Sequence, residues 1–331
     1  MATMVKATEH THPAPVVWLL TDNKPGHRNQ LKGVGNRLRV LAGASLYWVD
    51  TRSLKIALWR VLLASPPAMD ESLPHPDLII GAGTGTHRLL LSLRRIRKAR
   101  TLVIMKPAFP LNLVDGAIIP AHDGVREGDR ILVTEGVINT ITPLARITDK
   151  PEALILVGGP CPHYQWENDV ILGQINHLIG HYPDWRWTIS GSRRTPEDLL
   201  ARLGELANPK ITVVDPDTTH ADWLSHRLAA SKAVWVSPDS MSMVCESATS
   251  GVPTGLFQLT EQPGSRVVRG INRLIRDGRV GRWSDHVAVM SGKARHNNTL
   301  WEADRAARWI LKQGLLPIDK NTHVKAKRKT A

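Results

Sequence analysis

The chain has 331 residues, of which 42% are hydrophobic and 22% charged, a composition typical of a globular protein with room for two domains that each bury a core. Two cysteines, Cys161 and Cys245, are too few for a disulfide framework and lack the spacing of a zinc site, so we expect free thiols in a reducing compartment. A formal charge of +13 predicts attraction to an anionic partner, without choosing among nucleic acid, anionic lipid and nucleotide-sugar.

The chain carries no pattern of a secretory leader or a membrane span. Met1–Pro15 is polar and proline-marked, and no run reaches the ~18 apolar residues that a span needs. We therefore expect a cytoplasmic protein, with a peripheral position on the inner face of the cell membrane as the alternative. Basic residues cluster at Arg94–Arg100 and again in the tail at Lys325–Lys329. We interpret the tail as a disordered, solubilising end.

Short apolar, β-branched runs alternate with turns that carry Gly or Pro and with segments of helical period. This rhythm is typical of βαβ units around a parallel sheet, so the sequence predicts an α/β fold. Six strands are predicted in the first half of the chain, at Val16–Thr21, Leu46–Val49, Leu78–Ala82, Leu102–Met105, Ala117–Ile119 and Ile131–Thr134.

The apolar run Leu54–Leu63 has two interpretations. A buried crossover helix accounts for most of its residues, although Lys55 and Arg60 interrupt it. Together with the basic run Arg94–Arg100 of the same domain, it also fits a peripheral face toward an anionic membrane.

A domain boundary is predicted within Ile141–Pro151, which carries two prolines and mixed charge. The first domain would span 1–148 and the second 149–296. The rhythm restarts after this boundary, with strands predicted at Ala153–Val157, Trp187–Ser190, Ile211–Val214, Ala233–Val236 and Thr254–Leu259.

The chain ends in a helical segment, 297–314, and a basic tail, 315–331. The helix, Leu300–Lys312, has no strand after it and would be able to cross back to the first domain. The whole pattern predicts two doubly wound, Rossmann-type domains that face each other across a cleft. Open sheets of this class bind ligands outside the carboxyl ends of their strands, so we expect function in the strand-to-helix loops.

The strongest candidate for a functional loop is Ser237–Glu246, which follows an apolar strand and opens a helix. Asp239 or Ser240 can cap that helix, leaving free N–H groups that attract an anion. Ser242 and Glu246 are four residues apart and share one helix face. A hydroxyl near a phosphate and a carboxylate one turn later suit a diphosphate and a ribose diol. The structural alternative is an N-cap followed by a solvated Glu.

The second candidate is the loop Thr21–Gln30, which gathers reactive side chains at a helix start. His27 is the natural proton acceptor because only imidazole titrates near neutral pH, and Asp22 stands beside it as a second catalytic candidate. The structural alternative is a polar turn in which Gly26 gives the backbone its freedom. The candidate acceptor-binding residues are Lys24, Arg28, Gln30 and, from a glycine-rich loop further on, Thr84.

Two loops of the second domain are expected to support the donor. Gly158 and Gly159 follow a strand and would permit close backbone approach to a phosphate. The loop Ser190–Pro196 carries paired arginines able to neutralise a diphosphate, and Ser190 and Arg193 are the donor-binding candidates there. A Thr195 cap and Pro196 in the first helical turn explain part of this loop structurally.

Several other chemistries are not expected. The glycines of Gly81–His87 miss the G-x-G-x-x-G spacing, so we interpret that loop as a tight turn against a ligand or the facing domain. Asp215-Pro216-Asp217 has the D-x-D form of a metal-dependent transferase, but a turn is the better interpretation. We expect no metal and no cofactor. Nucleic-acid binding is not expected either, because two Phe and three Tyr offer no stacking platform.

Three segments of the chain resemble the mitochondrial-fission "elongated mitochondria" family of glycosyltransferase-like proteins, which has many bacterial members. The segments are TDNKPGHRNQ at Thr21–Gln30, ISGSRRTP at Ile189–Pro196 and SPDSMSMVCESATSGVP at Ser237–Pro253. Their order and spacing cover most of the chain, from about residue 15 to residue 290.

The resemblance implies a GT-B fold, similar to the enzyme that adds N-acetylglucosamine to lipid-linked peptidoglycan precursors and to UDP-N-acetylglucosamine 2-epimerase. In those relatives the second domain binds the nucleotide-sugar, with a Ser-containing helix start on the diphosphate and a downstream Glu on the ribose. GT-B enzymes usually need no metal. Met241 and Met243 stand where the epimerases have glycines. The residues that match the donor-binding pattern are Asp239, Ser240, Ser242 and Glu246.

Together these observations predict a metal-independent glycosyltransferase that moves a sugar from a nucleotide-sugar, with a UDP-sugar favoured, to a lipid-linked or envelope-glycan acceptor. The donor diphosphate would sit at the Ser240 helix start with Glu246 on the ribose, and His27 would be the general base. A sugar-nucleotide epimerase is the alternative within enzymology. A non-catalytic scaffold on an anionic membrane surface is the alternative outside it.

Overall fold

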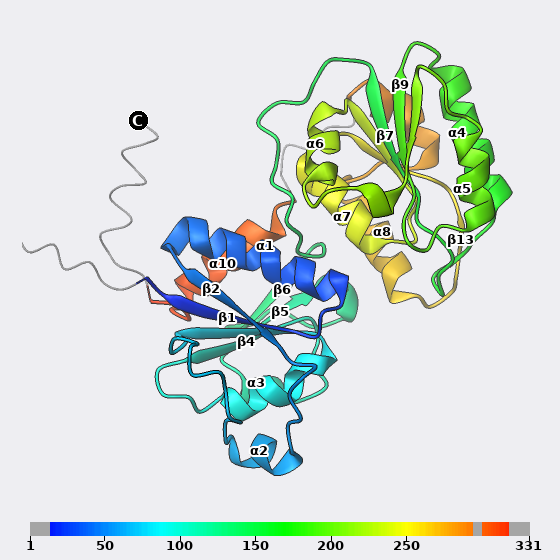
Figure 1. Ribbon diagram of the computed structural model, residues 1–331. Coiled ribbons are helices and arrows are strands. Elements are labelled where there is room, and N and C mark those ends of the chain that lie inside the picture. Colours follow the sequence, from blue (N-terminus) through cyan, green and yellow to red (C-terminus); the bar gives the residue numbers. More distant parts are fainter. Residues whose placement is uncertain (1–13, 294–299, 318–331) are drawn as a thin grey trace, which may run out of the picture. The chain divides into compact units, whose positions relative to one another are not determined.

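The computed structural model describes residues 14–293 and 300–317, so most of the basic tail expected at 315–331 lies outside the described residues. The chain forms two compact units, Met1–Ile118 with Ala306–Ala331 and Ile119–Arg305, in their described parts (Figure 1). The units thus divide at Ile118, before the boundary expected at 148. Membership of the sheets, by contrast, changes between residues 134 and 152, around the proline-bearing segment Ile141–Pro151.

The first sheet has the strand order β2-β1-β3-β4-β5-β6. Adjacent strands from β2 to β5 pair in parallel. The strands are apolar runs, and every residue of β3 and β5 is buried. Burial on both faces is expected of a parallel sheet covered by helices on either side. The bounds are β1 Val16–Thr21, β2 Ser45–Asp50, β3 Leu78–Ala82, β4 Arg100–Ile104, β5 Gly116–Pro120 and β6 Ile131–Thr134.

Helices cover both faces of this sheet, with α1 (Pro25–Ala42) and α10 (Glu302–Lys312) on one side and α3 (His87–Leu93) on the other (Figure 1). Helix α10 comes from the far end of the chain and, from Ala306 on, belongs to the first unit. At Gly116 of β5, an added Cβ would lie 3.0 Å from Leu315 and 3.2 Å from Trp309, so the glycine permits this helix to pack closely.

The run Leu54–Leu63 does not form a buried crossover helix, and that expectation was wrong. Only the short helix α2 (Leu58–Leu63) forms there, and none of its residues is buried. A residue at the end of α3 stabilises this helix, because the guanidinium of Arg94 donates to the carbonyls of Val61 and Leu62.

The second sheet is parallel throughout, with the order β10-β9-β7-β11-β12. Alternate residues of its strands serve opposite cores: Ala153 and Ile155 of β7 pack in one cluster, and Leu154 and Leu156 in the other. Both faces are therefore covered, which defines a doubly wound domain. The bounds are β7 Glu152–Leu156, β9 Arg186–Ser190, β10 Ile211–Val214, β11 Ala233–Val236 and β12 Thr254–Leu256.

Helices α4 and α5 lie on one face of the second sheet and α6, α7 and α8 on the other (Figure 1). A two-residue antiparallel pair, β8 with β13, was not predicted. Within residues 14–293 and 300–317, no helix is long and apolar enough to cross a bilayer. The remaining bounds are α4 Asn168–His181, α5 Glu197–Gly204, α6 Trp223–Ala230, α7 Met241–Ser250, α8 Arg266–Arg276, α9 His286–Met290, β8 Tyr164–Gln165 and β13 Thr260–Glu261.

Candidate functional site

The second sheet has one point at which its strand order reverses. The chain runs from β7 outward through β9 to β10, and then returns to the other side of β7 for β11 and β12. The loops after β7 and β11 therefore part in opposite directions, and ligands of open α/β sheets bind in the crevice between such loops. Both loops were predicted to be functional from the sequence, as Gly158-Gly159 and Ser237–Glu246.

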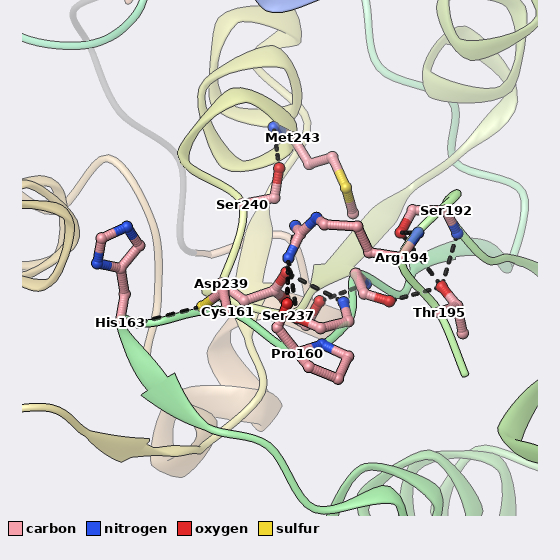
Figure 2. A network of polar contacts seen from close by, with 12 residues as sticks. Pro160, Cys161, His163, Ser192, Arg194, Thr195, Ser237, Asp239, Ser240 and Met243 are labelled. Atoms are coloured by element: carbon pink, nitrogen blue, oxygen red, sulfur yellow. Dashed lines mark hydrogen bonds and ion pairs between the residues drawn. The ribbon is translucent and has the colours of Figure 1, made fainter.

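Hydrogen bonds tie the loops after β7, β9 and β11 together (Figure 2). The N–H of Gly158 donates to Ser237 Oγ at 2.7 Å, and the N–H of Gly159 to Asp239 Oδ2 at 3.1 Å. From the third loop, Thr195 Oγ1 donates to the carbonyl of Val157 at 3.0 Å. The three loops consequently form one rigid floor at the carboxyl end of the sheet.

An ion pair lies at the centre of this floor. Arg194 Nη2 is 2.6 Å from Asp239 Oδ2, and Arg194 Nη1 donates to the carbonyls of Gly159 and Pro160 (Figure 2). The Asp239 side chain is fully buried, whereas that of Arg194 is 42% exposed. The sequence suggested that Asp239 binds the donor directly, but a fully buried carboxylate cannot touch a phosphate. Asp239 instead positions a guanidinium that can.

The two glycines after β7 have a structural role different from the one expected. Their N–H groups already donate to Ser237 and Asp239, so these groups are not available to a phosphate. A Cβ on Gly158 would overlap the Asp239 carboxylate, and one on Gly159 would overlap the carbonyl of Arg194. The close approach that the glycines permit is thus to protein atoms, and it sets the position of Arg194.

Helix α7 begins at this floor. Ser240 is its N-cap, with its side chain accepting from the N–H of Met243 at 3.5 Å. Asp239 is therefore not the cap, and it is the residue directly before the cap that pairs with Arg194. Ser242 and Glu246 both lie on a half-buried face of the helix, one turn apart, as their spacing predicted. Ser190, the last residue of β9, is buried, and its hydroxyl donates to the carbonyl of Gly191.

A groove of about 1190 Å³ adjoins the floor at the carboxyl ends of β11 and β12. It is open and mixed in character, with Pro238 and Phe257 on its apolar side and Glu261 and Arg282 on its polar side. Tyr164, also in its lining, is a buried residue whose hydroxyl has no hydrogen-bond partner among the described residues. Burial raises the pKa of this phenol, which therefore remains a neutral donor.

The first sheet also has a switch point, between β1 and β3, since its order begins β2-β1-β3. The loop after β1 and the start of α1 carry both catalytic candidates. His27, in the first turn of α1, has its Nδ1 at 2.9 Å from Asp22 Oδ1 and 3.0 Å from Oδ2. This contact favours the tautomer with the proton on Nδ1, which leaves Nε2 able to accept one.

The glycine-rich loop after β3 packs directly against this pair. Gly83 has a φ of +84°, and a Cβ there would overlap the His27 imidazole. A Cβ on Gly85 would lie 2.8 Å from Cβ of Asp22. The tight turn expected from the sequence therefore faces the catalytic candidates of its own unit. Burial, and secondarily the charge of His27, lower the pKa of His87 at the end of this loop.

The four acceptor-binding candidates do not share one environment. Lys24, Arg28 and Thr84 are exposed, with Arg28 lying 4.8 Å over the Trp48 ring. Gln30 is buried, and its amide nitrogen contacts Met105 Sδ at 3.5 Å. Gln30 is therefore a core residue in this structure and does not present its amide to an acceptor.

The D-x-D sequence has a structural explanation. Asp215 precedes a 3₁₀ turn, Pro216–Thr218, and its carboxylate accepts the N–H of Asp217 at 2.9 Å. The motif is thus a capped turn, as interpreted from its proline.

Arg194, Ser237 and Thr195 were not chosen as donor residues from the sequence. Adjacent arginines give no signal of which one turns inward, and the contacts of Ser237 and Thr195 depend on strands far apart in the chain.

Three comparisons with known proteins bear on this architecture. Residues 25–313 match the protein family described as "Mitochondrial fission ELM1". A protein of Rickettsia prowazekii (strain Madrid E), "Uncharacterized protein RP120", is 25% identical over 233 residues, which are 56% of this chain. The match spans 66% of that relative, slightly less than two thirds of its length.

Two solved structures are similar over most of the chain. UDP-GlcNAc 2-epimerase from Neisseria meningitidis, solved with UDP-GlcNAc bound, has a TM-score of 0.57 at 12% identity, covering 91% of this chain and 99% of that one. MurG of Acinetobacter baumannii has a TM-score of 0.50 at 14% identity, covering 91% of this chain and 100% of that one. Identities this low establish a shared GT-B fold and no more.

Proposed function

Since the chain belongs to the mitochondrial fission ELM1 family and has the GT-B fold, we propose that it transfers a sugar from a nucleotide-sugar donor, a UDP-sugar by preference, to a hydroxyl acceptor. A lipid-linked or envelope-glycan acceptor is the class we favour. The observation that carries the proposal is the half-exposed Arg194, fixed by the buried Asp239 at the start of α7.

The donor diphosphate would be held by Arg194 and by the first amides of α7. A helix start attracts anions through its unpaired N–H groups and its dipole, and α7 provides both at a sheet switch point. A guanidinium has five N–H donors, more than the bonds of Arg194 to Asp239, Gly159 and Pro160 use. Arg194 can therefore bind a phosphate while Asp239 keeps it in place.

The rest of the donor would extend along α7 and into the adjoining groove. Glu246, one turn after Ser242 on the same helix, would accept hydrogen bonds from a ribose diol. The groove of about 1190 Å³ is large enough for a base and a hexose, with the Tyr164 hydroxyl as a buried donor.

The first unit would provide the general base. Asp22 holds the His27 imidazole at 2.9 Å, so that Nε2 would take the proton of an acceptor hydroxyl. The acceptor oxygen would attack the anomeric carbon as the bond from that carbon to the diphosphate breaks and the nucleoside diphosphate leaves. A single displacement of this kind inverts the anomeric configuration. The exposed Lys24, Arg28 and Thr84 lie in the two loops that carry and support this pair, where they would contact an anionic acceptor.

The proposal is tested by calorimetry of the full chain with a panel of UDP-sugars. We expect Arg194→Ala and Glu246→Ala each to weaken binding by about tenfold or more, since each removes a charged hydrogen-bond partner. Arg193, the donor-binding candidate expected from the sequence, is exposed, whereas the contacts to Asp239 belong to Arg194. Arg193→Ala is therefore the matched control, because it deletes the same side chain from the neighbouring position and should bind as wild type does if Arg194 holds the donor. If wild type binds no nucleotide or nucleotide-sugar, the proposal is refuted.

Incubation with donor alone separates the two enzymatic readings. An epimerase converts its nucleotide-sugar without an acceptor, whereas a transferase leaves it intact apart from slow hydrolysis. Chromatography of the sugar-nucleotide products decides between them. Donor binding without any turnover across a range of acceptors would favour the scaffold reading.

A further inference from the structure

Helix α2 presents an apolar face that the protein does not cover. Leu58, Trp59, Leu62 and Leu63 are each between 50 and 69% exposed. They occupy positions i, i+1, i+4 and i+5 of one helix, so their side chains form a single patch. Among residues 14–293 and 300–317, the other large apolar residues with this exposure, Val40 and Val287, stand singly on different helices.

The patch is rigidly presented. Arg94, at the end of α3, donates from Nη1 to the carbonyl of Val61 and from Nη2 to that of Leu62 at 3.0 Å, which satisfies carbonyls at the end of α2. The guanidinium of Arg60 lies 4.6 Å over the Trp59 ring. Figure 1 shows α2 beyond α3, at the outer side of the first unit. The apolar side chains therefore point outward from a fixed helix.

The segment that contains the patch is basic. Residues 51–100 contain nine Lys and Arg but only three acids, Asp70, Glu71 and Asp77, which gives a net charge of +6. Two of these cations, Arg52 and Arg100, pair with acids just outside the segment. Arg95, Arg97 and Lys98 directly follow α3, the helix against which α2 packs, and all three are exposed. An apolar face bordered by basic side chains, with a Trp among the leucines, is the composition of a helix that lies in a bilayer surface.

We propose that α2 docks this protein onto a bilayer containing anionic lipid, with Leu58, Trp59, Leu62 and Leu63 buried among the acyl chains near the headgroups. The basic residues after α3 contribute electrostatic attraction to the lipid phosphates. The excess of positive charge favours a lipid surface over a protein partner, whose apolar interface would normally be bordered by both signs of charge. This inference does not depend on the proposed transferase activity.

The test is co-sedimentation of the full chain with vesicles of phosphatidylcholine, alone or mixed with phosphatidylglycerol, without nucleotide. We expect binding to the mixed vesicles that weakens with added salt. Leu58→Gln with Leu62→Gln should weaken it by more than about tenfold, because two aliphatic side chains no longer leave water. Arg95→Gln, Arg97→Gln and Lys98→Gln together should weaken it by on the order of a hundredfold at low salt.

Val40→Gln with Val287→Gln is the matched control, since these side chains are 68 and 63% exposed and lie outside the patch. It should bind vesicles as wild type does. All the substituted residues are exposed, so melting temperatures should stay close to that of wild type. Equal loss in the control and the α2 variant, or no binding of wild type to mixed vesicles, would overturn the proposal. So would a wild-type dimer in light scattering that the α2 variant abolishes, because the patch would then be a protein interface.

Discussion

At the scale of single residues, the absence of a side chain at Gly83 leaves the space that the His27 imidazole occupies beside Asp22. Its φ of +84° is unfavourable for other residues, and a Cβ would overlap the imidazole. We expect Gly83→Ala to destabilise the protein by about 1–3 kcal/mol and to lower kcat by on the order of a hundredfold, because the base is displaced. Thermal unfolding and a transferase assay measure the two effects.

Gly43→Ala separates backbone strain from crowding. Gly43 also has a positive φ, +67°, but nothing lies within 4 Å of the position of its Cβ. It should lose stability like Gly83→Ala while keeping its activity. If both variants lose activity equally, the contact with His27 has no catalytic importance.

The ion pair between Arg194 and Asp239 should respond differently to the loss of each partner. Arg194→Ala leaves a fully buried carboxylate without its cation, for which we expect a loss of about 1–3 kcal/mol. Asp239→Asn should cost less, because the amide oxygen can still accept the N–H of Gly159 and the half-exposed Arg194 is solvated. Urea unfolding of both variants measures the difference. A larger loss for Asp239→Asn would contradict this account of the buried charge.

A site residue could be predicted where its role follows from its side-chain chemistry and from near neighbours in the sequence. It could not be predicted where the role depends on contacts between segments far apart in the chain. His27 and Asp22 are five residues apart at a helix start, so their local pairing was within reach of the sequence. Arg193 and Arg194 have identical side chains, and only the position of Asp239, in the loop after β11, determines which one is engaged. Gln30 looked available because it is polar, but its place on α1 turns it into the core.

At the scale of elements, helix α7 places Cys245 on its inner face, fully buried. Burial raises the pKa of this thiol to about 12, so almost no reactive thiolate exists near neutral pH. Cys161, in the loop between β7 and β8, is partly exposed. We expect one thiol per folded chain to react with Ellman's reagent, and Cys161→Ser to abolish the reaction. Both thiols should react once the chain is unfolded, and rapid labelling of native Cys161→Ser would show that α7 opens.

Strands were more predictable than the exposure of helices. The strands of both sheets are short β-branched runs between turns, and their buried positions leave little choice of structure. The pair β8–β13 was missed because it has two residues on each side and joins segments about a hundred residues apart. The burial predicted for α2 was wrong because the same apolar residues are compatible with a buried helix and with an exposed one. Only the tertiary contacts distinguish the two.

At the scale of the whole molecule, the two units have separate cores, and a nucleotide-sugar should stabilise only one of them. We expect calorimetric unfolding in two transitions, with the donor at a hundred times its Kd raising the transition of Ile119–Arg305 by roughly 5–10 °C. Arg194→Ala should abolish the shift. An equal shift of both transitions would show that the units unfold together.

The topology of each sheet says more about function than the identity of any loop. Both candidate loops sit at switch points, one between β1 and β3 and one between β7 and β11. The sequence predicted the loops from their polar residues. It did not give the strand order, because the order depends on which side of the sheet each crossover takes.

The packing of Trp309 and Leu315 against Gly116 also governs the order of events during synthesis. Strands β1 to β5 are synthesised before most of the second unit, but the helix that covers β5 is translated only after that unit. Ile119–Arg305 is continuous and can mature while translation is still under way. The domain whose synthesis starts first is therefore the one completed last, and a stalled or prematurely terminated chain would leave its β5 surface bare for chaperones or proteases to recognise.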